Sequence, residues 1–340
     1  MDDKEMILTG KHIDFHHHFV PPALFDYARA HGDRVDFQVL SQNGDLYFAY
    51  PNGSRIPIYP GQYDNEVRLR DLKTMRLDGA VLSVSPMCFL YWLDAQTALD
   101  VSVLCNDFAA QSAAQYPGVL FPMATLPMQD MTLAIQELRR AHEVLHINAV
   151  EVAPVIEGFL PDDLRYEEFY RYCAENGVTI FLHPQVREVR KEYERYYNTN
   201  LVGNVYETNL ALNHMMFGGV FERHPKLKVL AAHGGGYFPY QLGRLQHGYE
   251  VRQEPKASID RGPMAFLDNL YFDTITHWKP ALQFLADSFG AERVVIGTDY
   301  PFDMGDLDPM TNVDALRLTR EQREMICNKT AASLLKLRCE

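Results

Sequence analysis

Short runs of β-branched and other apolar residues alternate with longer amphipathic segments along this chain, and that alternation constrains the fold more than any other feature. Eight runs are expected to be strands: Ile13–His16, Ala80–Val84, Val119–Thr125, Ile147–Val152, Thr179–His183, Lys228–Ala232, Leu270–Asp273 and Val294–Thr298. Strands that alternate with helices form parallel sheets, and the chain has no glycine-rich nucleotide loop of the open, doubly wound kind. We therefore predict an α/β fold, a (β/α)8 TIM barrel that spans residues 1–340 as one domain.

One segment interrupts this alternation after the first strand. Leu46, Phe48 and Tyr50 alternate with other residues, and the Pro-Asn-Gly sequence at 51–53 favours a turn. We interpret residues 41–60 as a β-hairpin insertion. Because it follows the C-terminal end of a barrel strand, where active sites of this architecture lie, we expect it to act as a lid or wall.

Charge and cysteine content limit the partners and the compartment. The net charge of -13 argues against a phosphate-binding surface, so nucleic acid is not an expected partner. Charged residues interrupt every apolar stretch well before the ~20 residues that cross a bilayer, which predicts no membrane span. The five cysteines are widely spaced without a C-x-x-C pair, and the first ten residues are acidic rather than signal-like. These features predict a cytoplasmic protein.

His16 and His18 stand two residues apart at the end of the first predicted strand. Side chains in a strand alternate between its faces, so both imidazoles point the same way and can reach one ion. His17 must point the other way, and packing or a surface hydrogen bond is the better interpretation for it.

Three further polar residues occupy strand ends: His183 ends the fifth strand, His233 follows the sixth and Asp299 follows the eighth. The C-terminal ends of barrel strands converge although they are far apart in sequence. A single histidine in such a place is more often a hydrogen-bonded core residue, but five residues at four strand ends are hard to explain that way. Imidazoles with a carboxylate suit zinc and leave positions open for water or substrate.

Longer motifs surround these residues: I-D-F-H-H-H at 13–18, F-L-H-P at 181–184, A-H-G-G-G at 232–236, L-G-R at 242–244 and G-T-D-Y-P-F at 297–302. Over nearly its whole length the chain resembles the amidohydrolase superfamily, and within it the decarboxylase branch typified by α-amino-β-carboxymuconate-ε-semialdehyde decarboxylase. The stretch H-H-H-F-V-P-P at 16–22 also resembles salicylate-type decarboxylases of that branch. The glycine-rich and G-T-D-Y-P-F motifs together are specific, whereas H-x-H occurs throughout the superfamily.

The resemblance implies one zinc ion, with manganese as the alternative, and assigns the catalytic roles to His233 and Asp299. The metal ligands that it implies are His16, His18, His183 and Asp299. His233 would stand beside the metal's water as general acid or base. The implied reaction is the non-oxidative decarboxylation of an aromatic or conjugated unsaturated carboxylic acid with an ortho hydroxyl or amino group.

Two arginines match family residues that contribute to substrate binding, and the one matched by Arg55 binds the substrate's carboxylate. Arg55 lies on the predicted hairpin, and an exposed surface charge is the alternative interpretation for it. Arg244 matches a residue that reaches into the neighbouring subunit's site, which implies a homodimer.

The chain departs from the family where Pro184-Gln185 replaces Pro-Trp, so an amide takes the place of a flat apolar wall and a different substrate is expected. Several aromatic-type residues are candidates for the pocket, with packing in the core as the equal alternative: Phe89, Tyr91, Trp92, His277, Trp278 and Phe302.

Two other functions stay open. A metal-dependent hydrolase or hydratase could use the same scaffold, although residues 147–152 of the fourth strand lack the lysine that bridges two metals, which favours a mononuclear site. A metal-binding scaffold without activity usually goes with lost ligands, and here every ligand position is filled.

Overall fold

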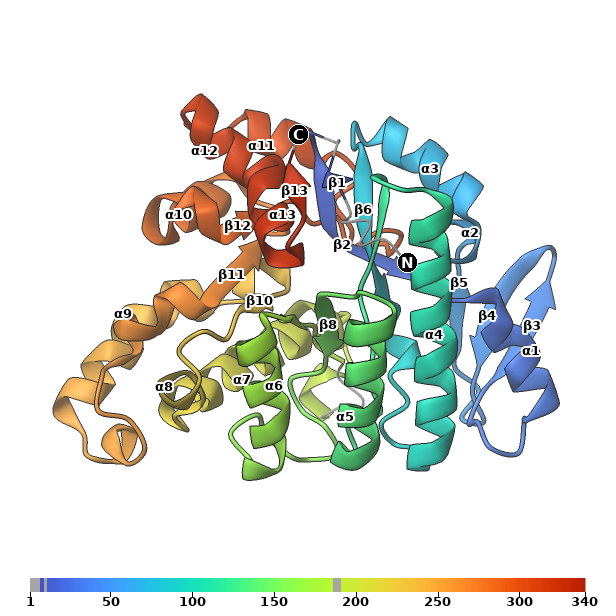
Figure 1. Ribbon diagram of the computed structural model, residues 1–340, viewed down its shortest axis with the longest axis horizontal. Helices are drawn as coiled ribbons and strands as arrows, with labels where there is room; N and C mark the ends of the chain where they lie inside the picture. The colour runs from blue at the N-terminus through green and yellow to red at the C-terminus, as the bar shows by residue number, and fades with distance from the viewer. Residues whose placement is uncertain (1–6, 9–10, 186–190, 340) are drawn as a thin grey trace.

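The computed structural model describes residues 7–8, 11–185 and 191–339 of the chain (Figure 1). Most of the acidic N-terminal stretch therefore lies outside the described residues. All eight predicted strands are present: β2 (Ile13–Phe19), β6 (Gly79–Val84), β7 (Leu120–Pro122), β8 (Ala149–Val152), β9 (Thr179–Leu182), β10 (Val229–Ala231), β11 (Leu270–Asp273) and β12 (Val294–Val295).

These strands form one closed, parallel ring. The order β2-β6-β7 makes one sheet and β8-β9-β10-β11-β12 makes another, with every pair parallel. Parallel bridges join the two sheets on both sides, between Ala124 and Val150 and between Asp14 and Ile296. The predicted α/β barrel is confirmed.

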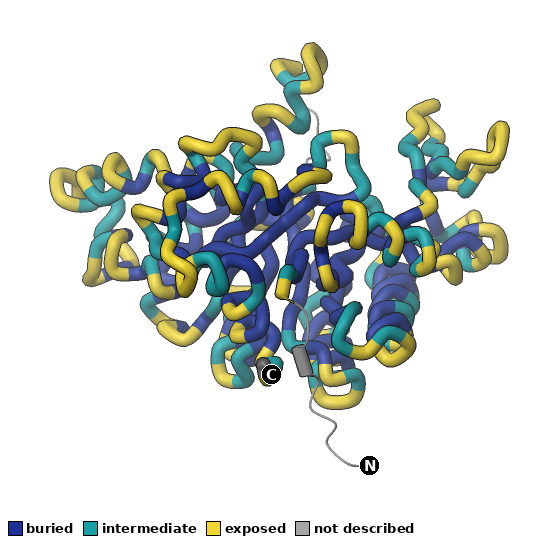
Figure 2. Tube along the Cα trace, turned by 90° about the horizontal axis from the view of Figure 1, so that it is seen from above, coloured by how far each residue is buried: buried dark blue, intermediate teal, exposed yellow. Residues whose placement is uncertain are grey.

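Helices surround the strands, and buried residues fill the centre of the molecule (Figures 1 and 2). The longer helices are α1 (Pro22–Ala30), α3 (Asn65–Thr74), α4 (Ala95–Gln115), α5 (Met131–Arg139), α6 (Glu167–Asn176), α7 (Val205–Phe217), α9 (Phe238–Val251) and α10 (Lys279–Phe289). Shorter helices are α2 (Pro60–Tyr63), α8 (Val220–Arg223), α11 (Pro309–Asp314), α12 (Arg320–Glu324) and α13 (Thr330–Leu335). None of the described helices is both long and apolar enough to cross a membrane.

The barrel is filled from its N-terminal end. Alternate strand residues such as Phe15, Phe121 and Phe181 pack inside it together with Leu335 of α13. The Thr179 hydroxyl donates a hydrogen bond of 2.8 Å to the Leu334 carbonyl, which ties α13 across this end. The C-terminal ends of the strands are thereby left to build a site.

The segment predicted as a hairpin is a three-stranded antiparallel sheet at the edge of the molecule (Figure 1), with β3 (Gln38–Gln42), β4 (Asp45–Ala49) and β5 (Arg55–Ile58) in that order. The expected turn joins β4 to β5, and Gly53 adopts a φ of 87° there. The additional strand β3 is the other neighbour of β4, whose Phe48 is buried against Phe37. A role for this sheet as a lid stays a prediction.

Candidate metal centre

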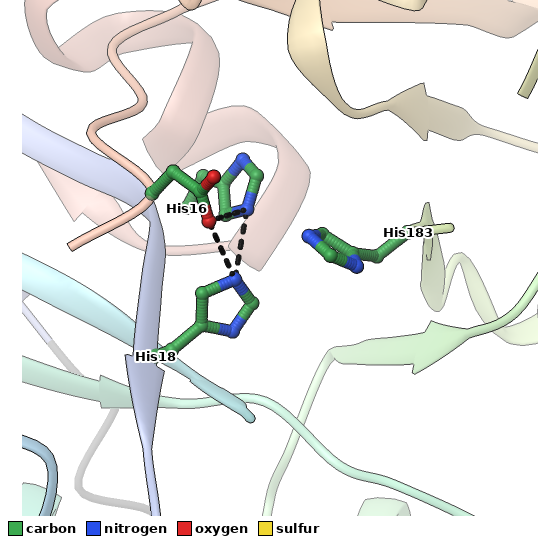
Figure 3. A group of neighbouring side chains, drawn as sticks. His16, His18 and His183 are labelled. Atoms are coloured by element: carbon green, nitrogen blue, oxygen red, sulfur yellow. Dashed lines mark hydrogen bonds and ion pairs between the residues drawn. The ribbon is translucent and has the colours of Figure 1, made fainter. Parts of the chain in front are cut away.

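The four predicted ligands lie together at the C-terminal end of the barrel. His16 and His18 come from β2, His183 follows β9 and Asp299 follows β12. One ligand atom from each lies within 4.8 Å of the others, and all four residues are buried. Figure 3 shows the imidazole rings of His16 and His18, both from β2, and of His183, which follows β9, grouped around a common centre.

Hydrogen bonds at Nδ1 of two predicted ligands, His16 and His18, fix the protonation state of their Nε2 atoms. Nδ1 of His16 lies 2.8 Å from an Asp273 carboxylate oxygen, and Nδ1 of His18 lies 3.0 Å from the Val84 carbonyl. Both oxygens can only accept, so each Nδ1 donates and each Nε2 of the neutral ring carries a lone pair. The two Nε2 atoms are 3.0 Å apart and lie 3.3 and 3.1 Å from Asp299 Oδ1. Three electron-rich atoms that face one another need a cation between them.

The electrostatics of the cluster also favour positive charge. Burial alone lowers the pKa of His16, but the carboxylates of Asp299 and Asp273 outweigh it and raise that pKa to about 10. Burial raises the pKa of Asp299, and the charge of His16 more than reverses this, so the carboxyl stays ionised with a pKa well below its usual range. The cluster therefore holds either a proton or a metal ion.

His183 provides a further test of whether a metal fits. Neither of its ring nitrogens has a hydrogen-bond partner among the described residues, although the ring is buried. Its ring centroid lies 4.9 Å from that of His16 and 4.8 Å from that of His18. Burial and the neighbouring imidazoles hold its pKa well below the usual value, which keeps it neutral and able to ligate. A buried imidazole without partners is explained by a bound ion, and three nitrogens with one carboxylate oxygen suit a divalent metal.

His233 lies beside this cluster with one ring nitrogen near the carboxylate. Its Nε2 is 3.4 Å from Asp299 Oδ2, and its Nδ1 has no hydrogen-bond partner among the described residues. Both His233 and Asp299 adopt a φ of 56°, a left-handed conformation that is uncommon outside glycine and that is often found at functional sites.

The three glycines after His233 are required by a tight turn. Their φ values are 61°, 76° and 62° for Gly234, Gly235 and Gly236. A Cβ atom on Gly236 would come within 2.6 Å of the Val205 carbonyl oxygen, and one on Gly235 would come within 2.7 Å of the Phe272 ring. The run lets the chain reverse closely after β10 and holds His233 at the mouth of the barrel.

Asp273 is a positioning residue that the sequence analysis missed. Its buried carboxylate contacts His16 Nδ1 and accepts hydrogen bonds from the backbone N–H groups of His233 and Gly234, at 2.9 and 2.7 Å. It thus fixes the predicted metal ligand His16 and the turn that carries His233. The strand-end rule applied to the other residues would have found it, because it ends the predicted strand Leu270–Asp273.

His17 faces away from the cluster, as expected. Its Nδ1 lies 2.8 Å from Asp14 Oδ2, and its ring stacks on Tyr300 with a centroid distance of 4.4 Å. Thr298 also hydrogen-bonds to Asp14, so this network links β2 to the segment that carries Asp299.

A cavity of about 490 Å³ opens beside His233 and Asp299. Most of its wall is apolar and comes from α9, from the segment before α10 and from α10 itself: Pro239, Tyr240, Ile275, Trp278, Pro280, Ala281, Phe284 and Leu285. Leu201, Val205 and Met304 complete the apolar lining, and polar groups come from Asn200, Asn204, Thr276 and His277. An apolar cavity with a few polar groups at one end is typical of a small-molecule site.

The aromatic-type residues considered in the sequence divide between cavity and core. His277 and Trp278 line the cavity. Phe89 and Tyr91 stack on each other in the core, at a centroid distance of 5.2 Å, and the Phe302 ring packs on His18 at 5.1 Å. Trp92 is half-buried and donates a hydrogen bond to Asp36.

The two predicted substrate arginines lie elsewhere in this chain. Arg55 is exposed on β5, donates a hydrogen bond of 2.6 Å to Gln42, and is not among the residues that line the cavity. Arg244 is exposed on α9, one turn beyond Tyr240, which does line the cavity. Among the described residues, neither a lysine nor an arginine of this chain lines the cavity.

Comparisons with known proteins agree with this architecture. A family model described as amidohydrolase matches residues 13–337. The chain is 35% identical over 256 residues to 2-amino-3-carboxymuconate-6-semialdehyde decarboxylase of Dictyostelium discoideum, covering 75% of this chain and 71% of that protein. It is 27% identical to gamma-resorcylate decarboxylase of Rhodococcus jostii, covering 82% and 92%.

A solved structure resembles the whole chain. The dihydroxybenzoic acid decarboxylase of Polaromonas sp. JS666, which was crystallised with manganese and the inhibitor 2-nitroresorcinol, superposes with a TM-score of 0.78. It is 22% identical in sequence, and the match covers 97% of each chain.

Proposed function

Because the chain belongs to the amidohydrolase family and is one of its metal-dependent decarboxylases, we propose that it is a zinc-dependent, non-oxidative decarboxylase of an aromatic or conjugated carboxylic acid with an ortho hydroxyl or amino group. The observation that carries this proposal is the buried group of four potential metal ligands, His16, His18, His183 and Asp299. His233, which is not one of the four, lies beside this group and lines an apolar cavity. Manganese is the alternative ion, since the same donor atoms accept it.

When bound, a divalent ion at this cluster would act as a Lewis acid and orient the oxygen atoms of the substrate. His233 would deliver a proton to the ring carbon that bears the carboxylate. The carboxylate then leaves as CO2, and the electrons of the broken C–C bond return to the ring, so one proton replaces one CO2. An ortho hydroxyl or amino group donates electron density and stabilises the protonated ring.

Two other features of the site support this chemistry. Asp299 Oδ2 lies 3.4 Å from His233 Nε2 and orients the imidazole. The apolar wall surrounds the ring of the substrate and excludes water from the protonated carbon.

CO2 release tests the function directly. Enzyme loaded with zinc or with manganese should release one CO2 per arene formed from ortho-hydroxy or ortho-amino aromatic acids. It should act far more slowly on their meta isomers, which stabilise the protonated ring poorly. Formation of hydrated or hydrolysed products without CO2, from substrates of the corresponding kinds, would instead favour the hydratase or hydrolase function.

We also propose that the protein is cytoplasmic, because its four described cysteines are buried and form no disulfide.

We propose further that the protein is a homodimer in which Arg244 completes the neighbouring site. Tyr240, Arg244, His247 and Val251 are exposed and recur along one face of α9. Tyr240 is 80% exposed and Val251 is 60% exposed, so this face presents two large apolar side chains to solvent. A second copy that packs on this face would cover them and bring its Arg244 near the mouth of the cavity.

Mixed dimers test this arrangement. Arg244→Ala and His16→Ala should each be nearly inactive, because one lacks the substrate cation and the other lacks a metal ligand. When the two variants are refolded together, about half of the dimers are mixed and one of their two sites is rebuilt, so about a quarter of the wild-type activity should return. Mixed dimers that form but stay as inactive as either parent would contradict a shared site.

A further inference from the structure

The cavity beside the metal centre is larger than one aromatic ring requires. A cavity of ~150 Å³ is enough to bind benzene in a protein interior. The cavity here measures about 490 Å³, roughly three times that volume. A single-ring acid with its carboxylate at the cluster would leave most of the space unfilled.

The unfilled part is bounded by an apolar wall that runs from the metal centre to the surface. Ile275 and Leu285 are buried, at 3% and 2% exposed, and form its inner part. Phe284 is 43% exposed and Trp278 is 68% exposed, and they form its outer part. Large apolar side chains that remain exposed around a cavity mark a surface that a ligand covers.

The chemistry of the lining limits what can occupy this space. Among the described residues, the acidic or basic side chains in the lining are Asp299 and His233 at the metal end and His277 at the rim, with neither lysine nor arginine. A charged substituent beside Ile275 and Leu285 would lose its hydration without gaining an ion pair from this chain. The space therefore favours an apolar group.

We propose that Ile275, Trp278, Phe284 and Leu285 form a subsite for a second ring, or an apolar substituent of similar size, carried by the substrate's aromatic acid. The position of the acid group rests on the proposed function. Phe284 and Trp278 form the outer part of this subsite and determine its selectivity.

Nitro analogues test the subsite without turnover, because a nitro group replaces the carboxylate and cannot leave as CO2. Calorimetric titration of the metal-loaded enzyme would compare 2-nitrophenol with 3-nitro-2-naphthol, whose second ring extends away from the nitro group. We expect the naphthol to bind about tenfold more tightly or better, since the added ring buries apolar surface against the wall.

Variants of the apolar wall test which side chains cause the preference for the naphthol. In Phe284→Ala and in Trp278→Ala the preference should fall to threefold or less, while the affinity for 2-nitrophenol stays within a factor of about two. Leu164→Ala is the matched control, because this side chain is 72% exposed and does not line the cavity. It should retain the full preference.

Three results would overturn the subsite: equal affinity for the two analogues, failure of the naphthol to bind, or a preference that persists in both wall variants. The CO2 assay separates this inference from the proposed function. A preference for the naphthol in an enzyme that releases no CO2 from any acid contradicts the function alone. CO2 release together with equal binding of the analogues contradicts the subsite alone.

Discussion

Asp299→Ala is expected to remove both the bound metal and the decarboxylase activity, and His183→Ala should do the same. Oδ1 of Asp299 lies within 3.3 Å of both His16 Nε2 and His18 Nε2, so it supplies the only negative charge among the four ligand atoms. Its loss leaves neutral imidazoles around a divalent ion. Losing any one of four ligands opens the site and weakens binding greatly.

Metal analysis of the purified variants by mass spectrometry gives the result, with about one ion per chain expected in the wild-type protein. Asp303→Ala and His31→Ala, at exposed positions, are controls for the loss of a carboxylate and of an imidazole. Alanine at the left-handed position of Asp299 costs ~1–2 kcal/mol by itself, so circular dichroism must show that the variant folds. Full occupancy in a folded Asp299→Ala or His183→Ala would show that the ligand assignment is wrong.

The barrel could be predicted because its signal repeats. Each strand is a short apolar run bounded by polar residues, and eight such runs leave few alternatives to a closed parallel ring. The same regularity allowed the metal ligands to be predicted, because the last residues of all the strands lie at one end of the barrel. Asp273 fits that rule and was overlooked, because none of the family motifs contains it, whereas Asp299 lies in the G-T-D-Y-P-F motif.

The insertion and the cavity depended on tertiary contacts that the sequence does not reveal. Strand β3 pairs with β4 and was not recognised, because Gln38–Gln42 lacks a strong alternation of apolar and polar residues. Phe284 lies on a helix with an ordinary amphipathic pattern, and nothing in that pattern separates a residue that faces a cavity from one that packs on a neighbour. Resemblance to the family pointed instead to Arg55, which this chain holds on an exposed strand.

A variant of His233 can separate metal binding from catalysis, because this residue lies beside the predicted metal ligands and is not itself predicted to be one. His233→Ala should keep about one metal per chain and lose activity by ~10²–10⁴-fold, the usual contribution of a general acid or base. His233→Asn is the better matched variant, since asparagine tolerates the left-handed φ of 56° but has no proton to deliver at neutral pH. Both variants should still bind 2-nitrophenol.

Rescue by free imidazole tests whether His233 supplies the proton. The His233 ring borders a cavity of about 490 Å³, so in His233→Ala an added imidazole can enter the space that the side chain has left and supply the missing proton. Activity should rise with its concentration, and the rise should follow the protonated fraction of imidazole as pH changes. Asp299→Ala should show no such recovery, because it lacks the metal. A His233→Ala enzyme that is nearly fully active without imidazole would mean that the proton comes from another group.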